Sequence, residues 1–148
     1  MDQRPTTTTS DLMNRIRKTR TLHSFLERNS VHLVQPDFVE LVNRFCDERG
    51  LVREHIIRRS NIENAFGHQI FRGTRHPSRD KVLQLCFGFP LGVDDAQHLL
   101  LSAGKRQLHP KIKRDTAILF CLNRGVHLTD AQQILDDLSM PLLGDERE

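Results

Sequence analysis

The sequence lacks tryptophan and tyrosine, and eight phenylalanines supply all of its large aromatic side chains. Together with a mean hydropathy of -0.48, this composition favours either a modest core or an added binding surface. No run of about 18 apolar residues is present, so nothing is expected to span a membrane. The first residues, MDQRPTTTTSD, contain no apolar segment of the secretory kind, so we expect a cytoplasmic protein.

Cysteine is also scarce, because the three residues Cys46, Cys86 and Cys121 lie far apart and form no CxxC pair. They are expected to be reduced and buried, not joined in disulfides or bound to a metal. The eight histidines show no HExxH or paired-ligand spacing. Neither zinc nor another cofactor is therefore expected.

Catalytic signatures are missing as well. The sequence has no glycine-rich phosphate loop, no GxSxG nucleophile motif and no kinase-like set of residues. Adjacent carboxylates occur at 94–95 and 136–137, but their side chains would diverge on a helix and suit helix caps or solvent. We therefore expect no enzyme activity and assign no catalytic residue.

The sequence does contain charge that is sorted into blocks. The net charge is only +3, but residues 49–81 carry 8 basic against 3 acidic side chains, and residues 105–127 carry 6 against 1. The final stretch, 128–148, carries 1 against 6. Basic patches attract polyanions, although a charged run can equally be an ordinary solvated face.

Hydrophobic spacing, together with start and stop residues, predicts an all-α fold. No alternating run of β-branched residues and no Asn-Gly or Asp-Gly hairpin turn occurs. Two pairs, Asp37 with Glu40 and Thr129 with Gln132, have the spacing of capping boxes. We expect eight or nine helices, which lie within residues 11–28, 36–50, 53–60, 62–73, 78–89, 93–104, 110–125 and 129–139.

The chain also repeats itself at a shift of 35 residues. SRDKVLQLCFGFPLGVDDAQHLL, from Ser78, aligns with KRDTAILFCLNRGVHLTDAQQIL, from Lys113, and both copies contain Arg-Asp, Cys and Asp-Ala-Gln at matching positions. Each copy is expected to form a helical hairpin. We interpret the pair as a duplication whose copies stack side by side. The alternative is two unrelated hairpins that share cap chemistry.

Residues 53–73 place two short helices around a tight turn, which indicates a helix-turn-helix whose second helix can enter the major groove of DNA. From Asp37 to Leu91 the chain resembles the XRE family, the helix-turn-helix class of Cro and phage repressors. The most specific part is QIFRGTRHPS, residues 69–78, because recognition helices in that family end in Gly followed by a basic residue, Pro and Ser.

The resemblance implies a repressor-like five-helix domain, and the chain as a whole is expected to divide into three segments. Residues 1–35 would form a flexible N-terminus with a basic helical segment, and residues 36–104 the helix-turn-helix domain. Residues 105–148 would form a C-terminal helical hairpin, the second copy of the duplication, with an acidic tail.

Two departures from the family pattern concern packing. The family usually has Gly at the turn where Asn61 stands here, and Asn is among the few other residues that tolerate positive φ. The first motif helix normally carries Ala where this chain has Ile57, and the second carries Ile or Val where it has Gly67. We interpret this as an exchange of volume that keeps the helix crossing filled. The alternative is that Gly67 breaks the helix and the motif is degenerate.

The resemblance also implies which side chains face DNA. The predicted base-reading residues are Asn64, Ala65, His68, Gln69 and Arg72. Asn and Gln side chains can pair with adenine, and a methyl group can touch that of thymine. The residues expected to meet phosphates are Arg53, Thr74, Arg75 and Arg79.

Three charged residues fit a DNA face less easily. Glu63 would repel DNA unless it caps the helix or accepts a hydrogen bond from cytosine. Arg58 and Arg59 can instead face acidic side chains within the domain.

These features lead us to expect a sequence-specific double-stranded DNA-binding regulator. It would bind a pseudo-palindromic site as a homodimer, because one helix-turn-helix buries too little surface for tight specific binding. The alternative is a protein-interaction adaptor or antitoxin-like subunit that reuses the fold, which the duplicated hairpins, the acidic tail and Glu63 favour. The C-terminal hairpins are the expected surface for a dimer or protein partner, and no membrane partner is expected.

Overall fold

The computed structural model describes residues 8–29 and 37–145, and every regular element within these ranges is a helix. The predicted all-α class is confirmed for this part of the chain. Contacts divide the chain into two units, residues 1–35 and 36–148, which are described separately. The polar N-terminal start, the segment boundary expected between residues 35 and 36 and the last residues of the acidic tail lie outside the described ranges.

The first unit contains α1 (Thr9–Lys18) and α2 (Leu22–Asn29). A capping box starts α1, since the Thr8 hydroxyl accepts from the Asp11 amide at 3.1 Å and the Asp11 carboxylate accepts from the Thr8 amide at 3.3 Å. No residue of α1 is buried. This short helix therefore relies on its cap more than on core packing.

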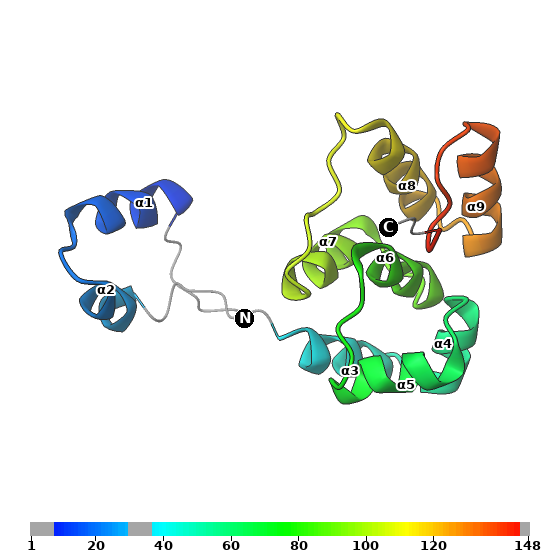
Figure 1. The fold of residues 1–148 in the computed structure, drawn as a ribbon, viewed down its shortest axis with the longest axis horizontal. Helices are drawn as coiled ribbons and strands as arrows, with labels where there is room; N and C mark the ends of the chain where they lie inside the picture. Colours follow the sequence, from blue (N-terminus) through cyan, green and yellow to red (C-terminus); the bar gives the residue numbers. More distant parts are fainter. Residues whose placement is uncertain (1–7, 30–36, 146–148) are drawn as a thin grey trace. The chain divides into compact units, whose positions relative to one another are not determined.

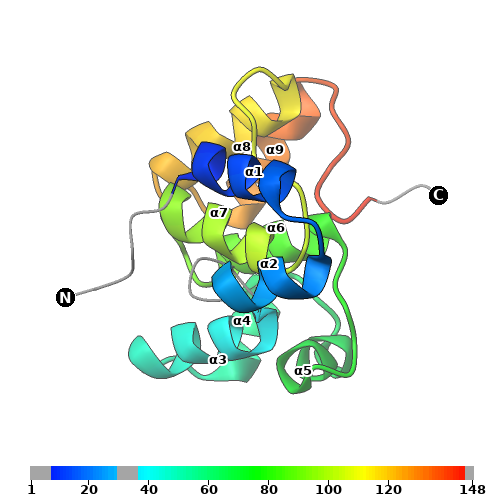
Figure 2. The same ribbon diagram turned by 90° about the vertical axis from the view of Figure 1, so that its left-hand side faces the viewer.

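The second unit is arranged in three layers (Figures 1 and 2). One end is formed by α3 (Phe38–Glu48), α4 (Arg53–Arg59) and α5 (Asn64–Arg72). The middle layer is formed by α6 (Arg79–Gly88) and α7 (Val93–Ser102). The other end is formed by α8 (Lys113–Asn123) and α9 (Leu128–Asp137).

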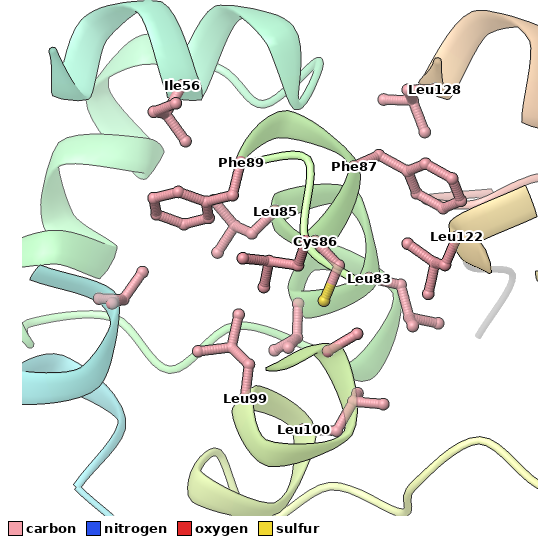
Figure 3. Packing of buried hydrophobic residues seen from close by; sticks show 14 of the residues in the cluster. Ile56, Leu83, Leu85, Cys86, Phe87, Phe89, Leu99, Leu100, Leu122 and Leu128 are labelled. Atoms are coloured by element: carbon pink, nitrogen blue, oxygen red, sulfur yellow. The ribbon is translucent and has the colours of Figure 1, made fainter. Parts of the chain in front are cut away.

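The central helix of this unit is α6, which is buried on every side. Seven consecutive residues, 82–88, are buried, as is typical of a helix that lies inside a core. In Figure 3, Phe89 lies on the side of α6 that faces Ile56 of α4, whereas Phe87 points toward Leu122 of α8. The two ends of the unit therefore share one core through α6.

Two crossed ion pairs join the middle layer to the C-terminal hairpin. Arg79 donates to both carboxylate oxygens of Asp115, at 3.2 and 3.0 Å, and Arg114 donates to both oxygens of Asp80, at 3.0 and 3.0 Å. The Asp115 side chain is only 1% exposed. Bidentate pairs of this geometry fix the relative position of the two hairpins.

The same hydrogen bonds recur at the 35-residue shift of the repeat. The amide groups of Gln97 and Gln132 each clamp the backbone eleven residues later, at Leu108 and Leu143, with distances of 2.7–2.8 Å. Arg79 and Arg114 likewise each donate to carbonyl groups in the segment that follows their own hairpin. The two hairpins thus have matching internal contacts as well as matching sequences.

These contacts correct one expected cap. The capping box predicted for Thr129 and Gln132 is wrong, because α9 begins at Leu128 and has no side-chain cap hydrogen bond. Gln132 serves the backbone clamp instead. Of the capping box predicted for Asp37 and Glu40, the Asp37 half is present, with its carboxylate accepting from the Glu40 amide at 3.0 Å.

The three cysteines are free and buried, as predicted. Burial raises the pKa of all three thiols, most strongly that of Cys86, so they are poor nucleophiles near neutral pH. Among the helices of the described ranges, none is long and apolar enough to cross a bilayer.

The carboxyl of Asp80 has a perturbed pKa. Burial raises the pKa, but hydrogen bonds from Arg114 and the Gly144 amide and the charges of Arg114 and Arg79 lower it, so it lies below its ordinary value of 3.8. The folded state therefore favours the carboxylate. This contribution to stability is present above about pH 4 and is lost as the pH falls through the lowered pKa.

We predict that Asp80→Asn lowers the thermal unfolding midpoint at pH 7 and lowers it less at about pH 3, because below the ordinary carboxyl pKa of 3.8 the unfolded chain takes up the proton and part of the contribution is lost. Circular dichroism melts at the two pH values measure the difference. Asp94→Asn, at an exposed position of α7, is the control and should change little at either pH. An equal effect of Asp80→Asn at both values would contradict the assignment.

Candidate functional site

The turn between α4 and α5 has a left-handed residue, as Asn61 has φ 53°. The amide of Asn61 donates to the Arg58 carbonyl at 3.0 Å, which closes the end of α4. The buried side chain of Gln84 on α6 donates to the Ser60 carbonyl at 2.9 Å and to the Asn61 carbonyl at 3.3 Å. Gln84 of the central helix therefore fixes the turn, a role that was not predicted from the sequence.

The crossing of α4 and α5 is close because Gly67 faces Ile57. A Cβ built on Gly67 would lie 2.6 Å from Cγ1 and 2.9 Å from Cδ1 of Ile57, far inside van der Waals contact. Both residues are buried, and α5 runs from Asn64 to Arg72 without a break at Gly67. The alternative in which this glycine breaks the helix is therefore contradicted.

One face of α5 is turned outward. Its buried side consists of Gly67, Ile70 and Phe71. Ala65, His68, Gln69 and Arg72 lie on the opposite side, whereas Asn64 lies at the start of α5 on the edge next to α4; Asn64, Ala65 and Arg72 are exposed and His68 and Gln69 are half-buried. The fold thus places four of the five predicted residues on one helical face, with Asn64 at its edge.

The surroundings of this face are rich in cations. Residues 53–76 contain five arginines against two glutamates. Arg75 lies 5.4 Å from the Phe66 ring centroid and donates to the Gln69 side-chain oxygen at 3.2 Å. The contact places a guanidinium beside the C-terminal half of α5, near the exposed Thr74.

Two of the residues predicted to meet phosphates bind side chains of another helix, Arg53 on α3 and Arg79 on α8. Arg53 donates to the Asn43 side chain at 2.9 Å and to Asp47 at 3.2 Å, and it stays partly exposed. The Arg79 guanidinium binds Asp115 and the Arg106 carbonyl, at 2.8 Å, and its side chain is 19% exposed, which leaves it little free for a phosphate. Arg79 therefore has a structural role between the two hairpins.

The remaining charged residues of this segment also differ from what the sequence suggested. Arg58 and Arg59, which were considered for contacts with acidic side chains, are exposed and form no ion pair with a described residue. They add two cations to the α4 side of the surface. Glu63 occupies the N-cap position of α5 but makes no side-chain cap hydrogen bond, so its carboxylate remains exposed beside Asn64.

The described residues contain no group of three or more His, Cys, Asp or Glu side chains that could hold a metal ion. The outward face of α5 combines hydrogen-bonding side chains with the arginines around it. Its chemistry is hydrogen bonding and charge.

Comparison of the chain with models of protein families, with curated proteins and with solved structures found no match.

The fit between Gly67 and Ile57 can be tested by a double-mutant cycle. Gly67→Val should destabilise the protein by about 1–3 kcal/mol or more through overpacking, and Ile57→Ala by about 2–5 kcal/mol through a cavity. The double variant should be more stable than the sum of the two losses by about 1 kcal/mol or more. Urea unfolding at equilibrium measures all four proteins, and simple additivity would count against the proposed exchange of volume.

Proposed function

We propose that α4, the turn at Asn61 and α5 form a helix-turn-helix, and that the protein is a sequence-specific double-stranded DNA-binding regulator. The observation that carries this proposal is the outward polar face of α5, which is held rigidly by Gly67 against Ile57 and by Gln84 under the turn. In a helix-turn-helix the second helix packs one face on the domain and enters the major groove with the other. Such a protein would work in the cytoplasm, on the nucleoid when bound.

The proposed base contacts follow from the side chains on this face. Asn64 is exposed in the first turn of α5, and its amide can pair with N6 and N7 of adenine. Ala65 offers a methyl group to thymine, and Arg72 can donate two hydrogen bonds to guanine. The side-chain oxygen of Gln69 accepts a hydrogen bond from Arg75. The two side chains would therefore contact DNA as one group.

Phosphate contacts would come from exposed side chains on either side of α5. Arg75 and the hydroxyl of Thr74 lie at its C-terminal end, and Arg58 and Arg59 lie on α4. Phosphate contacts position a protein on the duplex and supply most of its non-specific affinity. A homodimer on a pseudo-palindromic site would add the second half of the specific surface.

We predict that the protein binds a mixed-sequence duplex at low salt and loses affinity steeply as salt rises. The variants Arg58→Gln and Arg75→Gln should each weaken binding and reduce the slope of log affinity against log salt by about 1. Arg106→Gln removes the same charge from an exposed residue of the α7–α8 connection and should change the slope little. Fluorescence anisotropy with a labelled duplex measures the slopes, and no binding at low salt would oppose the proposal.

Base reading is tested separately by in vitro selection from a randomised duplex library. The wild-type protein should enrich a defined motif, and Asn64→Ala should relax the preference at one base pair at a cost of about 1–3 kcal/mol. The matched control is Asn123→Ala, at the exposed C-terminal end of α8. Failure to enrich any motif, or an unchanged motif in Asn64→Ala, would remove α5 as the reading helix.

The alternative function is a protein-interaction adaptor that keeps this fold. One specific observation favours it: Glu63, at the start of α5, is exposed and makes no cap hydrogen bond. A carboxylate at that place repels phosphates. If the folded protein binds no DNA at any salt concentration, the adaptor is favoured.

A further inference from the structure

The two duplicated hairpins share one buried set of positions. Leu83 and Cys86 of α6 are fully buried, and Ile118 and Cys121, at the matching positions of α8, are 1% exposed. The two crossed Arg–Asp ion pairs join the same two helices, α6 and α8. The hairpins therefore pack on each other through equivalent faces, in the manner of a two-fold dimer.

A second set of matching positions is buried in the first hairpin alone. Leu85 of α6 and Leu99 of α7 are fully buried, because α4 packs on α6 and α3 packs on α7. At the matching positions, Phe120 of α8 is 49% exposed and Ile134 of α9 is only half-buried. The face that α3 and α4 cover on the first hairpin is thus open on the second, within the residues described.

The open face forms a shallow apolar groove between α8 and α9. Its lining residues are Lys113, Thr116, Ala117, Phe120, Ile134 and Leu138. Phe120 and Leu138, which is 43% exposed, are large apolar side chains that cost free energy in water. Adjacent exposed apolar groups of this size are typical of an interaction surface.

The two helices that border this groove carry charges of opposite sign. Lys113 and Arg124, at the two ends of α8, share a helical face with Phe120 and are cationic, whereas Asp130 and Asp137 of α9 share a face with Ile134 and are anionic. Within the described ranges none of these four residues forms an ion pair. One edge of the groove is therefore positive and the other negative.

We propose that this face is a two-fold interface between two copies of the chain. A two-fold axis can set α8 of one copy against α9 of the other, so each positive edge meets a negative edge while the apolar side chains pack between them. A groove with one sign of charge on both edges would repel a copy of itself. The charge pattern thus identifies a second copy as the occupant.

The interface lies at the end of the second unit opposite α5 (Figures 1 and 2). Two copies joined there carry their α5 helices at the two far ends of the pair. If α5 reads DNA, the two half-sites are separated by the length of the pair. This last consequence rests on the proposed function, whereas the interface does not.

The interface is tested by sedimentation equilibrium of the full chain without DNA. The wild-type protein should form a dimer as its concentration rises, and Phe120→Asp should weaken the dimer by about tenfold or more. The control is Leu101→Asp on α7, where the side chain is 45% exposed and lies outside the groove, and it should leave the dimer unchanged. Circular dichroism melts verify that both variants fold.

Charge reversal tests the geometry of the pairing. One variant carries Lys113→Glu and Arg124→Glu, and a second carries Asp130→Lys and Asp137→Lys, so each has groove edges of a single sign. Neither variant should dimerise alone, but an equimolar mixture should form a heterodimer, because the α8 and α9 edges are again opposite between chains.

A wild-type chain that stays monomeric at its highest soluble concentration would overturn the proposal, as would a dimer that Phe120→Asp leaves intact. Two reversed variants that mix without forming a heterodimer would overturn the α8-to-α9 pairing. These outcomes are independent of DNA binding, since every measurement is made without DNA.

Discussion

The second unit depends on the burial of α6 on all of its sides. Gly88 shows how closely its neighbour approaches, because a Cβ there would lie 2.9 Å from the Ile56 carbonyl oxygen and 3.1 Å from the Ser60 Cβ of α4. The same helix carries Gln84, which holds the turn before α5, and Asp80, which binds Arg114 of the second hairpin. One buried helix thus positions both the candidate DNA surface and the C-terminal groove.

Much of this fold could be predicted from local sequence rules. The helices, the left-handed residue at Asn61 and the pairing of a large Ile57 with a small Gly67 follow from spacing, backbone preference and volume, which are properties of a few neighbouring residues. The roles of Arg79, Gln84 and Gln132 could not be predicted in this way, since their partners lie 11 to 36 residues away. An arginine beside a basic segment has the same local signature whether it binds phosphate or a buried carboxylate.

The duplication gives the unit two ends of different character. On the first hairpin, the apolar face is covered by α3 and α4, and this packing carries α5 with its outward polar side chains. On the second hairpin, the equivalent face remains exposed around Phe120 and is bordered by charges of opposite sign. We interpret the first end as a DNA-reading surface and the second as an assembly surface, so that one hairpin design serves two kinds of contact.

The central claim is that α5 and its flanking cations are where DNA binds. Amide chemical shifts of the ¹⁵N-labelled full chain, titrated with a short mixed-sequence duplex at low salt, test it most directly. The largest shifts are expected at the start of α5, around Asn64 and Ala65, and at Arg72 to Arg75, with α8 and α9 little affected. Shifts that concentrate on another surface, or no shifts at all, would contradict the account.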